Sequence, residues 1–148
     1  MLTIEKAKVE DIEKLCELLN ELFAMEVEFT PNKELQSKGL KTIIESDTLG
    51  DIFVAKLDEK VVGMVNILYT YSTALGEPVA IFEDMIVDKE YRGQKIATKL
   101  MEYIQNYLRE NGFKRLTLIT DGDNKRAQEF YKKSGFKESS MVSFRLEL

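Results

Sequence analysis

Two adjacent acidic residues, Glu83 and Asp84, interrupt the apolar run AIFEDMIV. A carboxylate inside a buried strand is costly unless it is paired or used, because burial removes its hydration. Neighbouring side chains of a strand point to opposite faces unless a bulge adds a residue. We therefore expect only one of the two carboxylates to face a ligand. The alternative is a salt bridge to a neighbouring helix.

A basic turn follows the same segment. The sequence YRGQKIA places Arg92, Gly93 and Lys95 directly before a helical pattern. The first turn of a helix has free N–H groups and a partial positive charge, which favour bound anions. The turn matches neither the phosphate loop GxxxxGK[ST] nor the dinucleotide turn GxGxxG. By itself it fits an anion site and an ordinary solvated helix start equally well.

The sequence contains no histidine and one cysteine, Cys16. This composition excludes Ser-His-Asp and Cys-His catalysis, and it removes histidine-based and structural zinc sites. We expect no metal. Any acid–base chemistry must fall to Glu, Asp, Tyr, Lys or water. A single cysteine also fits a reducing compartment, so we expect a cytoplasmic protein.

The overall composition is that of one globular domain spanning residues 1–148. The apolar share is 44%, the charged share is 32% and the net charge is −5. An acidic chain is poorly suited to neutralise phosphates, so we expect no nucleic-acid partner. No apolar run reaches the length of a membrane span, and the first residues show no signal peptide, so we expect no membrane partner.

The hydrophobic periodicity predicts the order β-α-α-β-β-β-α-β-α-β, which is an α+β or mixed-sheet domain. The predicted strands cover residues 3–8, 51–57, 61–71, 79–87, 114–120 and 139–148. The predicted helices cover residues 9–25, 32–46, 91–111 and 124–135, with Asn32 as a cap and Gly112 as a stop.

Two motifs in this order resemble a known family. The stretch FEDMIVDKEYRGQKIATKLM resembles the acetyl-CoA-binding signature of the GCN5-related N-acetyltransferases (GNAT), and NKRAQEFYKKSGF resembles a later segment of the same family. The predicted elements match the family over essentially the whole chain. The resemblance implies the GNAT acyl-CoA N-acyltransferase fold, a mixed α/β arrangement. Its twisted, mostly antiparallel sheet has splayed central strands and flanking helices.

The resemblance also implies a binding site for acetyl-CoA. Its pantetheine arm is expected beside Met85, Ile86 and Val87, and Asn124 is expected to bond to it or to position the helix that follows. The pyrophosphate is expected on the turn made by Arg92, Gly93, Gln94, Lys95, Ile96, Ala97 and Thr98. Lys95 stands where the family usually has glycine. We expect its side chain to point to phosphate or solvent, which leaves the N–H groups of the turn free.

The resemblance assigns the chemistry to three places. Tyr131 matches the family tyrosine that protonates the leaving thiolate, although it also suits a core position beside Phe130. A backbone N–H near Met85 would polarise the acetyl carbonyl. FED is similar to the LED of polyamine-type members, which favours Glu83 as the base. The implied reaction moves an acetyl group directly to a primary amine through a tetrahedral intermediate.

The acceptor is expected to be a small cationic amine. Glu26, Glu28, Asp84, Tyr69 and Tyr71 are candidates to surround its ammonium group by charge and cation–π contact. A protein or peptide amine and an aminoglycoside are weaker candidates. A non-catalytic CoA-binding regulatory module and an unrelated nucleotide-binding domain remain alternative functions. A homodimer is possible, because the strand predicted at 139–148 can pair between chains.

Overall fold

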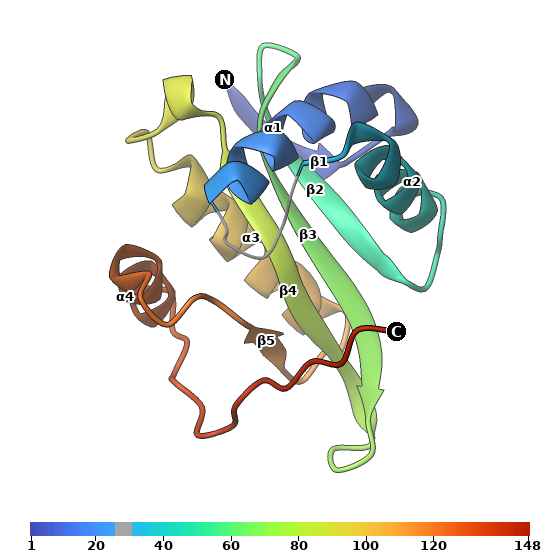
Figure 1. Ribbon diagram of the computed structural model, residues 1–148, viewed down its shortest axis with the longest axis vertical. Helices are drawn as coiled ribbons and strands as arrows, with labels where there is room; N and C mark the ends of the chain where they lie inside the picture. The colour runs from blue at the N-terminus through green and yellow to red at the C-terminus, as the bar shows by residue number, and fades with distance from the viewer. Residues whose placement is uncertain (26–30) are drawn as a thin grey trace.

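A five-stranded sheet in the order β1-β2-β3-β4-β5 forms the centre of the molecule (Figure 1). The computed structural model describes residues 1–25 and 31–148. The strands are β1 Leu2–Lys6, β2 Gly50–Leu57, β3 Lys60–Ser72, β4 Glu77–Val87 and β5 Leu116–Leu118. The first four pair antiparallel, and β5 pairs parallel to β4. The predicted mixed α/β fold is confirmed.

The helices lie on the two faces of this sheet. They are α1 Ile12–Met25, α2 Lys33–Ile44, α3 Ile96–Glu110 and α4 Lys125–Lys133, with short 3-10 turns at Val9–Asp11 and Lys89–Tyr91. Helices α1 and α2 cover one face, here called the α1–α2 face, and α3 covers the other, the α3 face (Figure 1). No helix among the described residues is long and apolar enough to cross a membrane.

Local sequence signals explain where the elements begin and end. The Asn32 side chain accepts from Leu35 N–H at 3.1 Å and so caps α2 as predicted. After α3, Gly112 has φ of 80° and Phe113 N–H donates to Leu108 O, which closes the helix. Asp58 and Glu59, both with positive φ, form the tight turn between β2 and β3.

Each face of the sheet has its own core. On the α3 face, Ile96, Leu100, Ile104 and Leu108 recur at helical spacing and pack on the strands. On the α1–α2 face, Cys16 is 1% exposed and its Sγ lies 3.3 Å from Ser37 Oγ, which connects α1 to α2. The sheet is therefore buried on both sides.

Strand β4 contains a β-bulge. Its register with β3 runs from Ile67 opposite Phe82 directly to Asn66 opposite Asp84, so Glu83 is the extra residue. A bulge shifts the alternation by one, and the side chains after it change phase relative to those before it. Phe82 and Met85, three residues apart, therefore both pack on the α3 face.

The pairing of β4 with β5 is short. It covers only Ala80, Ile81 and Phe82, opposite Leu116, Thr117 and Leu118. From Glu83 to the end of β4, no described strand lies on that side. The resemblance implies splayed central strands, and the splay observed here lies between β4 and the last strand, β5.

The strand predicted at 139–148 is wrong. Residues 139–148 form no helix or strand, and every one of them is exposed. A strand needs a neighbouring edge to satisfy its backbone hydrogen bonds, and this segment pairs with none of the described strands. The predicted strand at 114–120 is likewise shortened to Leu116–Leu118.

Candidate functional site

The bulge in β4 brings both carboxylates to one groove. Glu83 and Asp84 line a cavity of about 350 Å³ on the α1–α2 face. Residues of α1, α2 and β3 complete its wall, among them Leu19, Phe23, Gln36, Leu40 and Leu68. Glu83 is exposed and Asp84 is half-buried. Strict alternation would have separated the two side chains, and Glu83 as the bulged residue is what prevents this.

Asn66 of β3 lies in the same groove, and the sequence interpretation did not single it out. It is 5% exposed, and its Nδ2 donates to Asp84 Oδ2 at 3.5 Å. Its Oδ1 is buried and has no hydrogen-bond partner among the described residues. A buried amide oxygen without a donor is unfavourable, so the groove is suited to a ligand that supplies an N–H. The available signal was an isolated Asn in the apolar run VVGMVNIL.

Tyr131 lies where β4 and β5 separate. Its ring meets Phe82 edge-on, with centroids 5.8 Å apart, and it also contacts Phe130 and Phe136. Phe82 is the last β4 residue paired to β5 and immediately precedes Glu83. Tyr131 is half-buried against the α3-face core, which fits the core position that the sequence allowed beside Phe130; its catalytic role stays a prediction.

The end of β4 offers an open strand edge. Met85, Ile86 and Val87 pair with β3 on one side only. An unpaired strand edge can bind an extended ligand through its backbone groups. One acceptor is already used, because Arg92 Nε donates to Val87 O at 3.2 Å.

The turn after β4 has the backbone of an anion site. Gly93 has φ of 82°, and Lys95, the N-cap of α3, is left-handed with φ of 62°. No side chain at the N-cap occupies the free N–H groups of the first turn of α3. The position usually held by glycine therefore requires a glycine-like conformation, which Lys95 adopts. Around this turn Gln94 and Thr98 are exposed, Ala97 is half-buried, and Ile96 is buried in the α3-face core.

Two ion pairs fix this turn to α1. Lys14 Nζ lies 3.0 Å from Asp88 Oδ2, and Arg92 lies 3.6 Å from Glu21 Oε2. The pKa of Asp88 is lowered, mainly because Glu90 N–H donates to its carboxylate and also because Lys14 is close; burial opposes this effect. The Arg92 guanidinium thus faces α1, whereas the sequence predicted it on a phosphate. Asn124 is also engaged: its Oδ1 caps α4 by accepting from Ala127 N–H at 3.2 Å.

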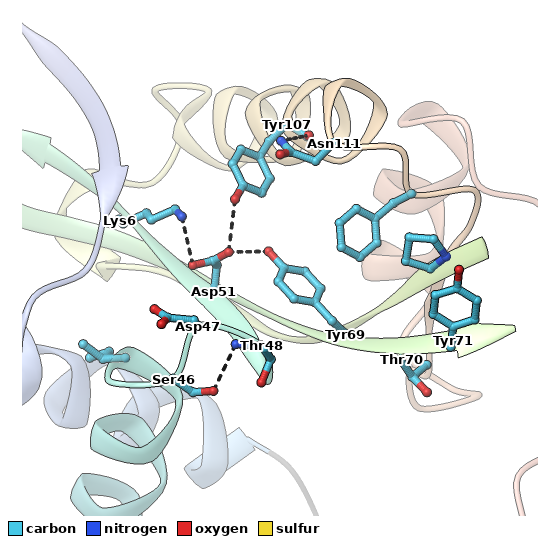
Figure 2. Close-up of a pocket in the computed structure, with 13 residues that line it drawn as sticks. Lys6, Ser46, Asp47, Thr48, Asp51, Tyr69, Thr70, Tyr71, Tyr107 and Asn111 are labelled. Carbon is cyan, nitrogen blue, oxygen red and sulfur yellow. Dashed lines mark hydrogen bonds and ion pairs between the residues drawn. The ribbon is translucent and has the colours of Figure 1, made fainter.

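The two tyrosines predicted for the acceptor line a different cavity. Tyr69 and Tyr71 border a space of about 630 Å³ together with Asp51 and Tyr107 (Figure 2). Asp51 Oδ2 accepts from Tyr69 at 2.5 Å and from Tyr107 at 3.3 Å, and Lys6 lies 3.4 Å from Oδ1. Burial, followed by the hydrogen bond to Asp51, raises the pKa of Tyr69.

The structure therefore does not group all the predicted acceptor residues. The Tyr69 ring packs with the α3-face core, whereas the groove with Glu83 and Asp84 lies on the α1–α2 face. Glu26 and Glu28 lie outside the described residues. Among residues 1–25 and 31–148, no group of three acidic, cysteine or histidine side chains is placed to hold a metal ion.

The residues that form the bulged strand and the left-handed turn fall within a match to a known family. Residues 12–136 match the Acetyltransferase (GNAT) family, and the chain belongs to it. The match includes β4, the turn, α3 and α4.

Individual relatives agree with this assignment. Human N-acetyltransferase 8B is 33% identical over 92 residues, which are 62% of this chain and 40% of that protein. Bovine thialysine N-epsilon-acetyltransferase is 36% identical over 75 residues, or 51% of this chain and 44% of that protein. The chain thus spans less than half the length of these two relatives. The crystal structure of a possible acetyltransferase from Clostridium difficile 630 superimposes with a TM-score of 0.90 at 23% identity, covering 100% and 98% of the two chains.

Proposed function

We propose that this chain transfers the acetyl group of acetyl-CoA to the primary amine of a small cationic acceptor. The observation that carries the proposal is the bulge at Glu83. It places two carboxylates and a buried, unpartnered amide oxygen in one groove, next to the strand edge left open by the β4–β5 splay. The groove and the open edge then serve as acceptor side and donor side of one reaction.

The donor side fits acetyl-CoA. The free N–H groups of α3 and the turn around Gly93 and Lys95 would hold the pyrophosphate, since oriented backbone N–H groups bind phosphate oxygens. The edge at Met85, Ile86 and Val87 would hold the pantetheine arm. Acetyl-CoA supplies the acetyl group as a thioester.

The acceptor side favours a cationic amine. Two carboxylates at the groove attract an ammonium group, and Asn66 Oδ1 can accept one of its N–H bonds. An ammonium group with a pKa near 10.4 must lose a proton before its nitrogen can attack. Glu83, the more exposed carboxylate, is placed to take that proton directly or through water. Asp84, which is bonded to Asn66, is placed to hold the amine.

The leaving thiolate needs a proton as well. As the C–N bond forms and the C–S bond breaks, Tyr131 would donate its phenolic proton to the sulfur. Its position against Phe82, directly before Glu83, supports this role. The similarity to a thialysine acetyltransferase also supports a small amine as acceptor. The single, buried Cys16 supports a reducing compartment such as the cytoplasm.

The test measures thiol release from acetyl-CoA across a panel of polyamines, amino-acid amines, peptides and aminoglycosides. We expect turnover with a small cationic amine. Tyr131→Phe should lower kcat by about 100-fold or more, the usual contribution of a positioned acid or base. Tyr103→Phe on α3 is the matched control, because it also removes one phenolic hydroxyl. Glu83→Gln should show a comparable loss, with Glu77→Gln at the start of β4 as its control.

Other outcomes would contradict the proposal. Thermal stabilisation by acetyl-CoA without turnover for any amine would indicate a CoA-binding module. Better protection by ATP or NAD than by CoA would indicate an unrelated nucleotide-binding protein. Turnover with peptides alone would move the acceptor to protein amines.

A further inference from the structure

The groove with Glu83 and Asp84 has one charged end and one apolar wall. The two carboxylates are neighbours in β4, so both belong to the same end of the groove. The rest of the lining is mainly apolar and is here called the apolar wall: Leu19 and Phe23 of α1, Leu35, Leu40 and Ile43 of α2, and Leu68 of β3. The volume of about 350 Å³ is at the small end of the range for ligand pockets, roughly 300–1,000 Å³. These dimensions suit a ligand with one polar end and a short apolar body.

The polar side chains of α2 that border the groove are already bonded within the protein. Gln36 Nε2 donates to Asn20 Oδ1 at 3.1 Å, and Gln36 Oε1 accepts from Asn32 N–H at 2.7 Å. Asn32 Oδ1 accepts from Leu35 N–H. Hydroxyl or amino groups along the body of a ligand would lose their hydration there without gaining a partner from these side chains. At the charged end, by contrast, Asn66 Oδ1 is buried and has no partner among the described residues.

A second positive charge on the ligand would also lack a partner. Among the described residues that line the groove, only Glu83 and Asp84 are acidic. Helix α1 has three acidic residues, none of which lines the groove. Each of them is paired with a cation of this chain: Glu13 with Lys33 at 3.5 Å, Glu17 with Lys14 at 3.4 Å, and Glu21 with Arg92 at 3.6 Å. The groove therefore suits one ammonium group and disfavours a second one.

We propose that the acceptor is a monoamine with an apolar body, which means an alkylamine or arylalkylamine with one positive charge. Its ammonium group would lie against the two carboxylates and Asn66 Oδ1, and its hydrocarbon body would be buried on the apolar wall. The inference rests on the proposed acetyl transfer and narrows its acceptor. The product is a neutral amide: the C–N bond forms as the C–S bond breaks. The ammonium group loses two protons, of which the leaving sulfur takes one and solvent the other.

A matched pair of acceptors tests this inference. Hexylamine and hexamethylenediamine have the same carbon chain and differ by one terminal amino group. We expect kcat/KM to be about 10-fold or more higher for hexylamine, because the second ammonium group of the diamine must lose hydration at the apolar wall without a carboxylate. The diamine has two reactive ends, so equal recognition would instead favour it. Thiol release measures turnover, and calorimetric titration of each amine into the CoA complex measures binding independently.

The outcomes separate this inference from the proposed function. Equal or better turnover of the diamine, or turnover with aminoglycosides alone, would overturn the inference and leave acetyl transfer to a cationic amine in place. No turnover with any amine would overturn the proposed function. Calorimetry then still decides which amine the groove holds, and tighter binding of the diamine would contradict the inference.

Gly39 of α2 offers a variant that narrows the groove and keeps the fold. It lines the groove, and a Cβ at this position would meet no other atom within 4 Å. Glycine is also an unfavourable residue inside a helix, so Gly39→Leu should fold. We expect it to raise KM for hexylamine by about 10-fold, to raise KM for the shorter butylamine less, and to leave KM for acetyl-CoA unchanged.

Lys41→Leu is the matched control, because it adds the same side chain at an exposed position of α2 that does not line the groove. The two amines carry the same charge, so the ratio of their KM values is insensitive to the lost lysine. This ratio should stay at its wild-type value in Lys41→Leu and rise in Gly39→Leu. The same ratio in both variants would overturn the placement of the hydrocarbon body on the apolar wall.

Discussion

Lys95 stands where the family motif usually has glycine, and it adopts a backbone conformation that favours glycine. Its φ of 62° lies in the left-handed region, which costs a residue with a Cβ about 1–2 kcal/mol. The sequence predicts that the Lys95 side chain points to phosphate or solvent, but it does not show the backbone conformation that a lysine must adopt here. The structure shows that the turn keeps its shape, and that Lys95 carries backbone strain which a glycine would not have.

A pair of substitutions separates this strain from the charge of Lys95. We expect Lys95→Gly to have a higher free energy of unfolding than Lys95→Ala, by about 1 kcal/mol, because only glycine relieves the left-handed strain. Urea denaturation of both variants measures this difference. If the ammonium group also contacts phosphate, both variants lose affinity for CoA equally. Equal stabilities of the two variants would show that Lys95 is not strained.

The surroundings of Glu83 and Asn66 could not be predicted from the sequence. The unexpected pair of carboxylates was visible in AIFEDMIV, but their common groove depends on the bulge. The bulge is defined by the pairing of β4 with β3, so it cannot be predicted from the sequence of β4 alone. Asn66 was hidden for the same reason, since its importance comes from its place opposite Asp84.

At the scale of elements, α1 holds the turn that follows β4 in place through two ion pairs. Lys14 and Glu21, seven residues apart, lie on the same side of this helix and pair with Asp88 and Arg92 on the two sides of a 3-10 turn. In one pair α1 provides the cation, Lys14, and in the other it provides the anion, Glu21. Each end of the turn therefore has its own partner on α1. The helix that lines the groove with Glu83 and Asp84 therefore also holds the turn that follows β4.

This support has a predictable pH dependence. The pKa of Asp88 is lower in the folded chain than its ordinary value of 3.8, so its carboxylate stabilises the fold above about pH 4. That stability is lost as the pH falls through the folded pKa. We expect Asp88→Asn to reduce the free energy of unfolding by about 1–3 kcal/mol at pH 7, and the difference from wild type to shrink below pH 4. Urea titrations at pH 7, 5 and 3.5 measure it.

Asp123→Asn serves as the control for this experiment, because Asp123 is exposed. It should change stability little at any of the three pH values. A deficit of Asp88→Asn that is the same at pH 7 and pH 3.5 would mean that the ionised carboxylate contributes nothing.

At the scale of the whole molecule, the two cavities have different lining residues. The groove with Glu83 lies on the α1–α2 face, whereas the cavity of Figure 2 is lined by residues at the ends of β1, β3 and α3. In the second cavity Asp51 already accepts from two phenols and pairs with Lys6. These four side chains satisfy one another through hydrogen bonds and an ion pair, which suits a structural connection between the strands and α3.

Tyr69→Phe tests whether the cavity of Figure 2 contributes to stability and not to the reaction. It should lower the free energy of unfolding by about 1–2 kcal/mol, because Asp51 loses a buried donor. The dissociation constant for acetyl-CoA and kcat should not change. Thermal unfolding and steady-state kinetics on one preparation give both results. A raised KM for the amine at unchanged stability would instead return Tyr69 to the acceptor site.

The sequence predicted most of the fold because its signals are local. Helix spacing, the Asn32 cap and the Gly112 stop depend on neighbours in the chain and were confirmed. The faces taken by Tyr69 and Glu83 depend on register, which is a property of strand pairs. The strand expected at 139–148 was wrong, because alternation within a segment does not by itself supply the pairing with another strand that a sheet needs.

Cys16 gives the molecule an internal reporter. The thiol lies between α1 and α2, where a reagent can reach it only when these helices separate. In the native state the protein therefore adds almost no background to a colorimetric assay of released CoA. Over longer times, the rate at which Cys16 is labelled measures how often α1 and α2 separate. The same two helices form a wall of the groove with Glu83 and Asp84, so this rate also reports how often that groove opens.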